Sequence, residues 1–337
     1  MAPSAAARAP HVVVTGVRNP VHLVHVAAYL RTLLEEFDDT ITVRHLGGGR
    51  TLGRIRVDDE VVRRHLPDDP RLDLTLGGPD PWRTPAGRDL HYVAIGAPGL
   101  KPYARMLAAR RGRPFTVVVT DEGLGTYGTW STRRDALRRQ GVRDPWATVR
   151  SAAVQTGSRV LTTRRFALYE RDGAGEWVVS EPIAAEFARQ LAGDPGSMPD
   201  AGDGRVVLLT QPWIALGVLS PETWVGRLRT IADRVREDGR EMVVRLHPAE
   251  DPRTYEGFPL LPARGPAELD PAVVGAAELL GGPSTALVNV AALYGVPARR
   301  LLIPELAGVE DRLGAVQHSL LDRYAPVWQC DGEQPLP

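Results

Sequence analysis

Short apolar runs alternate with helix-like segments along most of the chain. Residues 11–15 read HVVVT, residues 115–120 read FTVVVT and residues 206–210 read VVLLT. Runs that are apolar at nearly every position are typical of parallel strands buried on both faces. Segments between them, such as 21–37 and 103–110, place apolar residues at helical spacing. The sequence therefore predicts an α/β protein whose parallel sheets are covered by helices.

The 337 residues are enough for two such domains. The segment 192–205 reads AGDPGSMPDAGDGR and has little to bury, so it is a candidate linker. We predict a disordered N-terminus over 1–10, an N-terminal Rossmann-like domain over 11–191, the linker 192–205 and a C-terminal Rossmann-like domain over 206–337. Two such domains describe the GT-B architecture of nucleotide-sugar transferases, in which the two domains face a cleft.

Charge and cysteine content exclude several classes of protein. The 41 basic and 41 acidic residues cancel, which argues against a protein that coats nucleic acid. The one cysteine, Cys330, cannot form an internal disulfide or a cysteine-based zinc module, and it favours a reducing compartment. We see no signal peptide and no membrane span, and expect a cytoplasmic protein. Peripheral contact with a membrane stays open, as does the oligomeric state.

The basic residues are unevenly distributed. From residue 101 to 165 there are 14 basic residues against four acidic ones. On a helix, Arg134 and Arg138 would share one face, as would Arg139 and Arg143. Two interpretations remain open: a field that attracts an anionic acceptor, and an ordinary solvated helix whose arginines pair with acidic side chains.

Thr120 and then two acidic side chains, Asp121 and Glu122, follow the apolar run 115–119, and Gly123 allows a close turn past them. Ligands of open parallel sheets bind beyond the carboxyl ends of the strands. Neighbouring carboxylates raise each other's proton affinity, which suits a general base. The alternative is that they cap the next helix or pair with arginines.

A second strand-end loop contains His247 and Pro248, after the apolar run 242–246. The proline fixes the turn and directs the imidazole away from the strand end, where it could donate a proton or a hydrogen bond to a departing phosphate. A purely structural histidine is the alternative. His22 and His25, one helical turn apart, are assigned to helix packing.

A third loop runs from Gly281 through Gly282 to Ser284 and Thr285, and a helical segment follows it. A glycine-rich turn that leads into a helix directs free backbone N–H groups and the helix dipole at one point, which is an anion site. The alternative is a plain capped helix. There is no GxxxxGK[ST] loop or Asp-x-Asp triplet, which argues against P-loop hydrolases and metal-dependent GT-A transferases.

Taken in order, the Asp-Glu-Gly, His-Pro and Ser-Thr motifs resemble those of the bacterial sialyltransferase and polysialyltransferase families. Flanking segments also resemble the polysialyltransferase-type group: Asn19-Pro-Val-His-Leu23, Leu209-Thr-Gln-Pro212 and Ser-Thr-Ala-Leu-x-Asn over 284–289. The resemblance extends as short motifs from about residue 11 to 318. The arginine-rich segment after Asp121 has no counterpart in that pattern.

The resemblance implies an inverting, metal-independent glycosyltransferase that moves sialic acid, or a related nonulosonic acid, from its CMP-activated form to an acceptor hydroxyl. Asp121 would be the general base, with Glu122 as its neighbour or substitute, and His247 would stabilise and protonate the leaving phosphate. The candidate donor-binding residues are Gln211, Pro248, Gly282, Ser284 and Thr285. No cofactor and no metal are expected.

The expected partners are a nucleotide-sugar donor and a glycan or small-molecule acceptor. If the basic segment attracts the acceptor, the acceptor is anionic. No nucleic-acid partner is expected. The alternatives are a GT-B transferase that uses another donor, such as a CDP-polyol or other sugar nucleotide, and a non-catalytic protein that binds nucleotide sugars. The sequence leaves the acceptor, the linkage and the number of sugars added undetermined.

Overall fold

The computed structural model describes residues 9–45, 57–77, 88–109, 115–139, 141–193 and 204–328. The chain divides into two compact units, of which unit 1 holds the described residues up to Glu186 and unit 2 those from Phe187 onward. This boundary falls inside helix α6 (Glu181–Ala192). Most of the predicted linker and residues 1–8 of the predicted disordered N-terminus lie outside the described residues, whereas Ala9 and Pro10 are described and buried.

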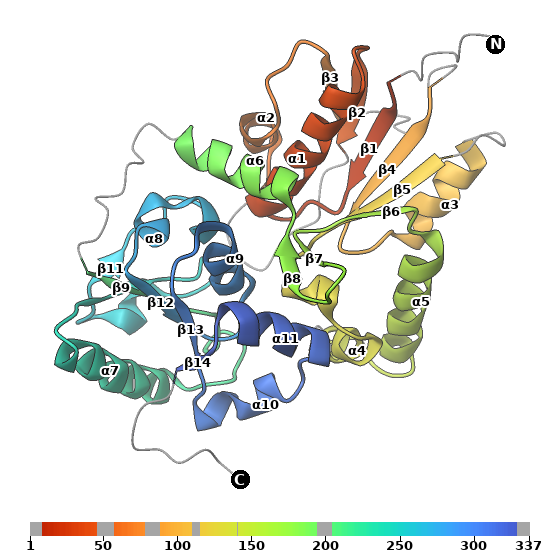
Figure 1. Ribbon diagram of the computed structural model, residues 1–337. Helices are drawn as coiled ribbons and strands as arrows, with labels where there is room; N and C mark the ends of the chain where they lie inside the picture. Colours follow the sequence, from red (N-terminus) through yellow and green to blue (C-terminus); the bar gives the residue numbers. More distant parts are fainter. Residues whose placement is uncertain are drawn as a thin grey trace. The chain divides into compact units, whose positions relative to one another are not determined.

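Unit 1 contains a six-stranded parallel sheet (Figure 1). Its strands follow the spatial order β3-β2-β1-β4-β5-β6. Their bounds are β1 (His11–Thr15), β2 (Ile41–His45), β3 (Leu72–Leu76), β4 (Leu90–Ile95), β5 (Phe115–Thr120) and β6 (Arg164–Phe166). The strands β1, β4 and β5 are the buried centre of the sheet, which accounts for their continuous apolar runs.

Helices and a short hairpin complete unit 1. The helix α1 follows β1 and begins at Pro20, with the Asn19 side chain accepting a hydrogen bond from the His22 N–H. His22 and His25 are both buried on this helix, as the packing interpretation requires. The remaining elements are α1 (Pro20–Glu36), α2 (Asp59–His65), α3 (Leu100–Ala109), η1 (Leu124–Tyr127), α4 (Trp130–Arg139), α5 (Trp146–Leu161), β7 (Tyr169–Arg171) and β8 (Trp177–Val179).

Unit 2 repeats the same sheet topology. Its strands follow the order β11-β10-β9-β12-β13-β14, and every neighbouring pair is parallel. The bounds are β9 (Val206–Leu209), β10 (Met242–Arg245), β11 (Leu260–Leu261), β12 (Glu278–Gly281), β13 (Ala298–Leu301) and β14 (Val327–Trp328). The strands β9, β10 and β12 contribute to one apolar core together with Trp224, Leu228 and Ile231 of helix α7.

The helices of unit 2 start where the sequence signals predict. Ser220 caps α7 by accepting from the Thr223 N–H, Pro221 is the first helical residue, and Gly295 ends α9 in the left-handed conformation. The bounds are α7 (Pro221–Glu237), η2 (Pro252–Tyr255), η3 (Ala267–Leu269), α8 (Pro271–Val274), α9 (Thr285–Tyr294), η4 (Pro304–Leu306), α10 (Ala307–Glu310) and α11 (Ala315–Tyr324).

The expected fold class, α/β with two Rossmann-like parallel sheets, is confirmed. In both units the strand order corresponds to 3-2-1-4-5-6, the order of doubly wound nucleotide-binding folds. The chain reverses direction across the sheet between β1 and β4 in unit 1 and between β9 and β12 in unit 2. Ligands of such sheets bind at this switch point, beyond the carboxyl ends of the strands.

Candidate functional site

The switch point of unit 2 brings the ends of three neighbouring strands together. Thr210 follows β9, which lies between β10 and β12. Its hydroxyl accepts a hydrogen bond from the His247 N–H at 2.8 Å, and its own N–H donates to the Arg245 carbonyl at 3.0 Å. The loop after β10 is therefore held against the end of β9, beside the glycine-rich turn after β12. We call Thr210, Gln211, His247, Gly282 and Ser284 the unit 2 strand-end cluster.

His247 is half-buried and its hydrogen bonding selects one tautomer. Its Nδ1 accepts from the Ala249 N–H at 3.1 Å, so the ring proton resides on Nε2. Burial lowers the pKa of His247, which favours the neutral form. A neutral imidazole with Nε2–H can donate a hydrogen bond to a phosphate oxygen. If the neutral ring gave up its Nε2 proton, it would become an imidazolate anion, which is unfavourable. The geometry therefore favours donation of a hydrogen bond over the proton transfer expected from the sequence.

A buried polar network fixes the loop that carries His247. The Thr210 hydroxyl and the Tyr255 hydroxyl both donate to Glu250, the latter at 2.6 Å, and Tyr255 accepts from Trp224 Nε1 at 2.9 Å. Burial raises the pKa of the Glu250 carboxyl, and hydrogen bonds from Thr210 and Tyr255 act in the opposite direction. This network ties the His-Pro loop to helix α7. The exposed Pro248 lies in the turn between His247 and Glu250.

The glycine-rich turn passes close to the end of β9. A β-carbon on Gly282 would lie 3.3 Å from Gln211 Oε1 and 3.1 Å from Trp213 Cζ2, so the missing side chain lets Gln211 approach this turn. Ser284 is the N-cap of α9, and its Oγ accepts from the Leu287 N–H at 3.1 Å. The serine hydroxyl still has its proton to donate. Ser284 and Thr285 are both half-buried at the helix N-terminus.

A second buried cluster lies behind α9. Asn289, from the segment 284–289, donates to Glu268 Oε1 at 3.0 Å, and Arg245 at the end of β10 forms a buried ion pair with Asp270 at 3.1 Å. Burial raises the pKa of Glu268, and Arg245 opposes that shift. Asn289 therefore has a structural role in this molecule, since it satisfies a buried carboxyl that anchors η3 against α9.

In unit 1, Asp121 lies directly after β5 and is 2% exposed. Its Oδ2 accepts from the Tyr127 hydroxyl at 2.7 Å and from the Leu168 N–H at 2.5 Å, while Oδ1 is buried without a hydrogen-bond partner among the described residues. Burial raises the pKa of Asp121 to about 6, and the two donated hydrogen bonds oppose that shift. A buried carboxyl with a raised pKa and one unused oxygen at a strand end is typical of a functional group.

Glu122 occupies a more exposed place at the switch point of unit 1. Its Oε1 lies 3.3 Å from Arg18 Nη1, which brings the loop after β1 to the end of β5. A β-carbon on Gly96 would lie 2.5 Å from Glu122 Oε2, and the φ of Gly96 is +73°, so this position requires glycine. The half-buried Arg133 of α4 is also close enough for Glu122 to favour its charged form. Glu122 therefore contacts Arg18 and interacts electrostatically with Arg133.

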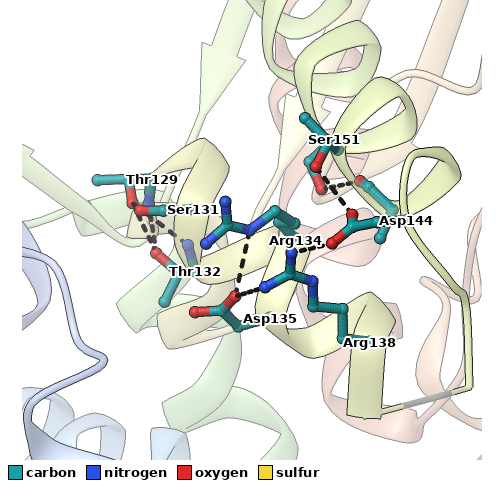
Figure 2. Close-up of polar contacts among 10 residues, drawn as sticks. Thr129, Ser131, Thr132, Arg134, Asp135, Arg138, Asp144 and Ser151 are labelled. Atoms are coloured by element: carbon teal, nitrogen blue, oxygen red, sulfur yellow. Dashed lines mark hydrogen bonds and ion pairs between the residues drawn. The ribbon is translucent and has the colours of Figure 1, made fainter.

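Two other arginines of α4 are paired with acidic side chains (Figure 2). Arg134 contacts Asp135 at 3.3 Å, and Arg138 contacts both Asp135, at 3.7 Å, and Asp144. Figure 2 shows both guanidinium groups turned toward these carboxylates. For Arg134 and Arg138 these ion pairs agree with the paired, solvated helix, one of the two interpretations that the sequence left open. The side chain of Arg139, also named in that hypothesis, lies outside the described part of the structure.

Among the described residues, the structure shows no group of three or more His, Cys, Asp or Glu side chains that could hold a metal ion. Cys330 is not among those residues. Likewise, no helix in the described part of the chain is long and apolar enough to cross a bilayer.

The structure collects the predicted residues into two groups, one in each unit. Gln211, His247, Gly282 and Ser284 come together in unit 2, with Thr285 following in the same helix, whereas Asp121 and Glu122 lie in unit 1. Sequence reasoning missed the residues that hold these groups in place. Thr210 carries a readable signal, a polar residue ending an apolar strand run. The others, Gly96, Tyr127, Glu250 and Tyr255, act through contacts that no local pattern indicates.

No family model matches this chain, and no curated protein matches it. Several solved structures are similar in fold. A UDP-N-acetylglucosamine 2-epimerase is 14% identical, with a TM-score of 0.47, over 90% of this chain and 82% of the other. Phytolacca americana UGT2, complexed with UDP-2-fluoro-glucose and pterostilbene, is 12% identical, with a TM-score of 0.45, over 94% and 83%.

The E. coli heptosyltransferase WaaC with ADP is 13% identical, with a TM-score of 0.40, over 89% of this chain and 90% of the other. At these identities and TM-scores the similarity transfers neither an activity nor a residue role.

Proposed function

We propose that this protein is a glycosyltransferase that moves sialic acid, or a related nonulosonic acid, from its CMP-activated form to an acceptor hydroxyl. One observation carries the proposal. At the switch point of unit 2, the Nε2–H of a neutral His247, the Gln211 side chain and the N-terminus of α9 lie at three neighbouring strand ends. Hydrogen-bond donors and a helix dipole at one point suit a phosphate oxygen.

The donor side of the reaction needs stabilisation of a leaving phosphate. Transfer from a CMP-linked sugar breaks the bond between the anomeric carbon and a phosphate oxygen, so negative charge grows on that oxygen. In our proposal His247 donates a hydrogen bond to the growing charge, and Ser284 with Thr285 holds the phosphate at the start of α9. Donors fixed in advance favour the transition state because they need no reorganisation.

The acceptor side needs a base for the attacking hydroxyl. We assign that role to Asp121, with Glu122 as the alternative. The pKa of about 6 makes Asp121 ionised yet still basic at neutral pH. We assign the proton to the buried Oδ1, which has no hydrogen-bond partner among the described residues, because Tyr127 and Leu168 already occupy Oδ2. The exposed Glu122 is oriented by Arg18 and bounds the same strand end.

A thermal-shift panel of CMP, CDP, UDP and GDP tests this proposal without any acceptor. A ligand that binds only the folded state stabilises it by about 2.7 kcal/mol at a hundredfold excess over its Kd, which raises the melting temperature by several degrees. We expect CMP to give the largest shift. A larger shift with CDP would favour a CDP-polyol transferase, and a larger shift with UDP or GDP would reject the sialyltransferase assignment.

A further inference from the structure

The outer side of α3 carries large apolar side chains that face water. The helix packs on its sheet through Met106, which is fully buried, with Tyr103 beside it. On its other side Leu100 and Leu107 are 52% and 39% exposed. The proposed reaction gives these two leucines no role.

A longer exposed stripe runs along α5. Trp146, Val149 and Val160 are 67%, 51% and 74% exposed. At 100° per residue they fall on one side of the helix, whereas the buried Ala147 and Ser151 lie on the other. The third buried residue, Gly157, lies at the edge of this apolar stripe, and the three large side chains of the stripe face water.

The helices α3 and α5 approach each other at Gly157. A β-carbon placed on Gly157 of α5 would lie 3.6 Å from Leu100 Cδ2 of α3. Figure 1 shows α3 and α5 near β5 and β6 of the unit 1 sheet. Large exposed apolar side chains grouped on one surface indicate an interaction site. We call this group the α3–α5 face: Leu100, Leu107, Trp146, Val149 and Val160.

The charge on these helices indicates what the face contacts. Together α3 and α5 contain four basic residues and no acidic one: Lys101, Arg105, Arg150 and Arg159. All four are exposed, and within the described residues none forms an ion pair. Asp144, the acidic residue just before α5, is paired with Arg138. An apolar centre with basic flanks, on helices that contain no acidic residue, complements an anionic, amphipathic partner.

We infer that the α3–α5 face docks on the surface of an anionic phospholipid bilayer. Trp146 and the valines enter the boundary between headgroups and acyl chains, where amphipathic side chains and tryptophan are favoured. The four cations remain at the level of the lipid phosphates. A second copy of this chain is a poorer partner, because it would bring four like charges against four others. The inference does not depend on the proposed transferase activity.

Vesicle sedimentation with the full-length protein tests the inference and needs neither donor nor acceptor. We expect binding to phosphatidylcholine vesicles that contain about 30% phosphatidylglycerol, and none to pure phosphatidylcholine. Raising NaCl from about 0.05 M to about 0.5 M should release most of the protein, since salt screens exposed charges.

Two sets of variants separate the charged and apolar contributions. The quadruple variant K101Q/R105Q/R150Q/R159Q should bind anionic vesicles at least about 100-fold more weakly. Trp146→Ser with Val160→Ser should weaken binding about tenfold or more through lost apolar contact. Two matched controls change exposed residues of unit 2. R229Q/R253Q/R264Q/R312Q removes four positive charges, as the quadruple variant does, and L216S/V316S removes two exposed apolar side chains, as the double variant does. All variants change exposed residues, and circular dichroism checks their folding.

Three outcomes would overturn the inference. The first is no binding of the wild-type protein to anionic vesicles at low salt. The second is an equal loss in the folded unit 2 controls, which would mean binding by overall charge. The third is a lipid-free dimer that Trp146→Ser dissociates, which would assign the face to a second copy; analytical ultracentrifugation detects it. Binding of the wild type that only the α3–α5 variants lose supports the inference.

Discussion

At the scale of single residues, Asp121 has the clearest physical signature. Its pKa is raised from 3.8 to about 6 because it is buried, so the folded state binds a proton more tightly than the unfolded state. Stability contributed by this group is therefore present below pH 4 and is lost as the pH rises through about 6. At neutral pH the folded protein therefore lacks this stabilisation, and such a loss of stability is typical of a group that is retained for chemistry.

Asp121→Asn should abolish transfer to the acceptor while leaving CMP binding intact. The same variant should gain stability relative to wild type as the pH rises from 4 to 7, by up to about 3 kcal/mol, because the amide cannot ionise. Wild-type kcat/KM should rise with pH through about 6 and then level off. Denaturant unfolding at several pH values and steady-state kinetics measure both effects, with Glu122→Gln as the matched control. Full activity of Asp121→Asn would move the base to Glu122 or elsewhere.

His247 is expected to act as a hydrogen-bond donor through Nε2. His247→Ala should lower turnover by roughly 10²- to 10⁴-fold with a small effect on stability, because the interaction is made mainly in the transition state. His247→Gln should retain more activity than the alanine variant, since its amide can still donate a hydrogen bond. Single-turnover rates with saturating donor provide the comparison. Unchanged chemistry in His247→Ala would make this residue structural.

At the scale of elements, the start of α9 serves two requirements at once. Ser284 caps the helix through its Oγ, and the same helix terminus is the proposed phosphate site. A cap is worth about 1 kcal/mol of stability, and a lost phosphate hydrogen bond weakens affinity by a similar amount. Substitutions that keep the helix cap but change the charge can separate the capping role of Ser284 from its proposed role in phosphate binding.

Ser284→Ala with Thr285→Ala should weaken CMP binding by about 1–3 kcal/mol and also lower stability. Ser284→Asp should preserve the helix cap, because aspartate is an equally good N-cap, yet it places a negative charge where the phosphate is proposed to bind. We therefore expect near wild-type stability and at least tenfold weaker CMP binding in that variant, measured by calorimetry. Normal CMP affinity of Ser284→Asp would exclude the phosphate role and leave only the cap.

At the scale of the whole molecule, the predicted chemistry assigns charge neutralisation to protein groups in place of a metal ion. The sequence has no Asp-x-Asp triplet, and in our proposal the α9 terminus and His247 provide the donors for a leaving phosphate. Activity should therefore survive exhaustive treatment with EDTA, with rates within about twofold of the untreated enzyme. Loss of activity that Mg²⁺ or Mn²⁺ restores would contradict this, and a metal-dependent transferase treated in parallel verifies the chelation.

Much of the fold could be read from local patterns because those patterns act over a few residues. Continuous apolar runs determine buried parallel strands such as β1, β5 and β9, and Ser220, Pro221 and Gly295 mark helix ends through backbone hydrogen bonding and φ. Short elements without such signals, among them β6, β11 and β14, were not predicted. Each pairs in parallel with one neighbouring strand at the edge of its sheet.

The candidate site, like the fold, has features that the sequence predicted and features that only the tertiary structure shows. By itself the sequence determined that Asp121, His247 and Ser284 follow apolar strands, and hence that they lie at the ligand-binding ends of parallel sheets. Only the tertiary structure decided the strand order that makes β9 the neighbour of both β10 and β12, the burial that raises the pKa of Asp121 and the ion pairs that occupy Arg134 and Arg138. The physical reason is range: propensity and capping act within a few residues, whereas desolvation and charge pairing depend on groups far apart in the chain.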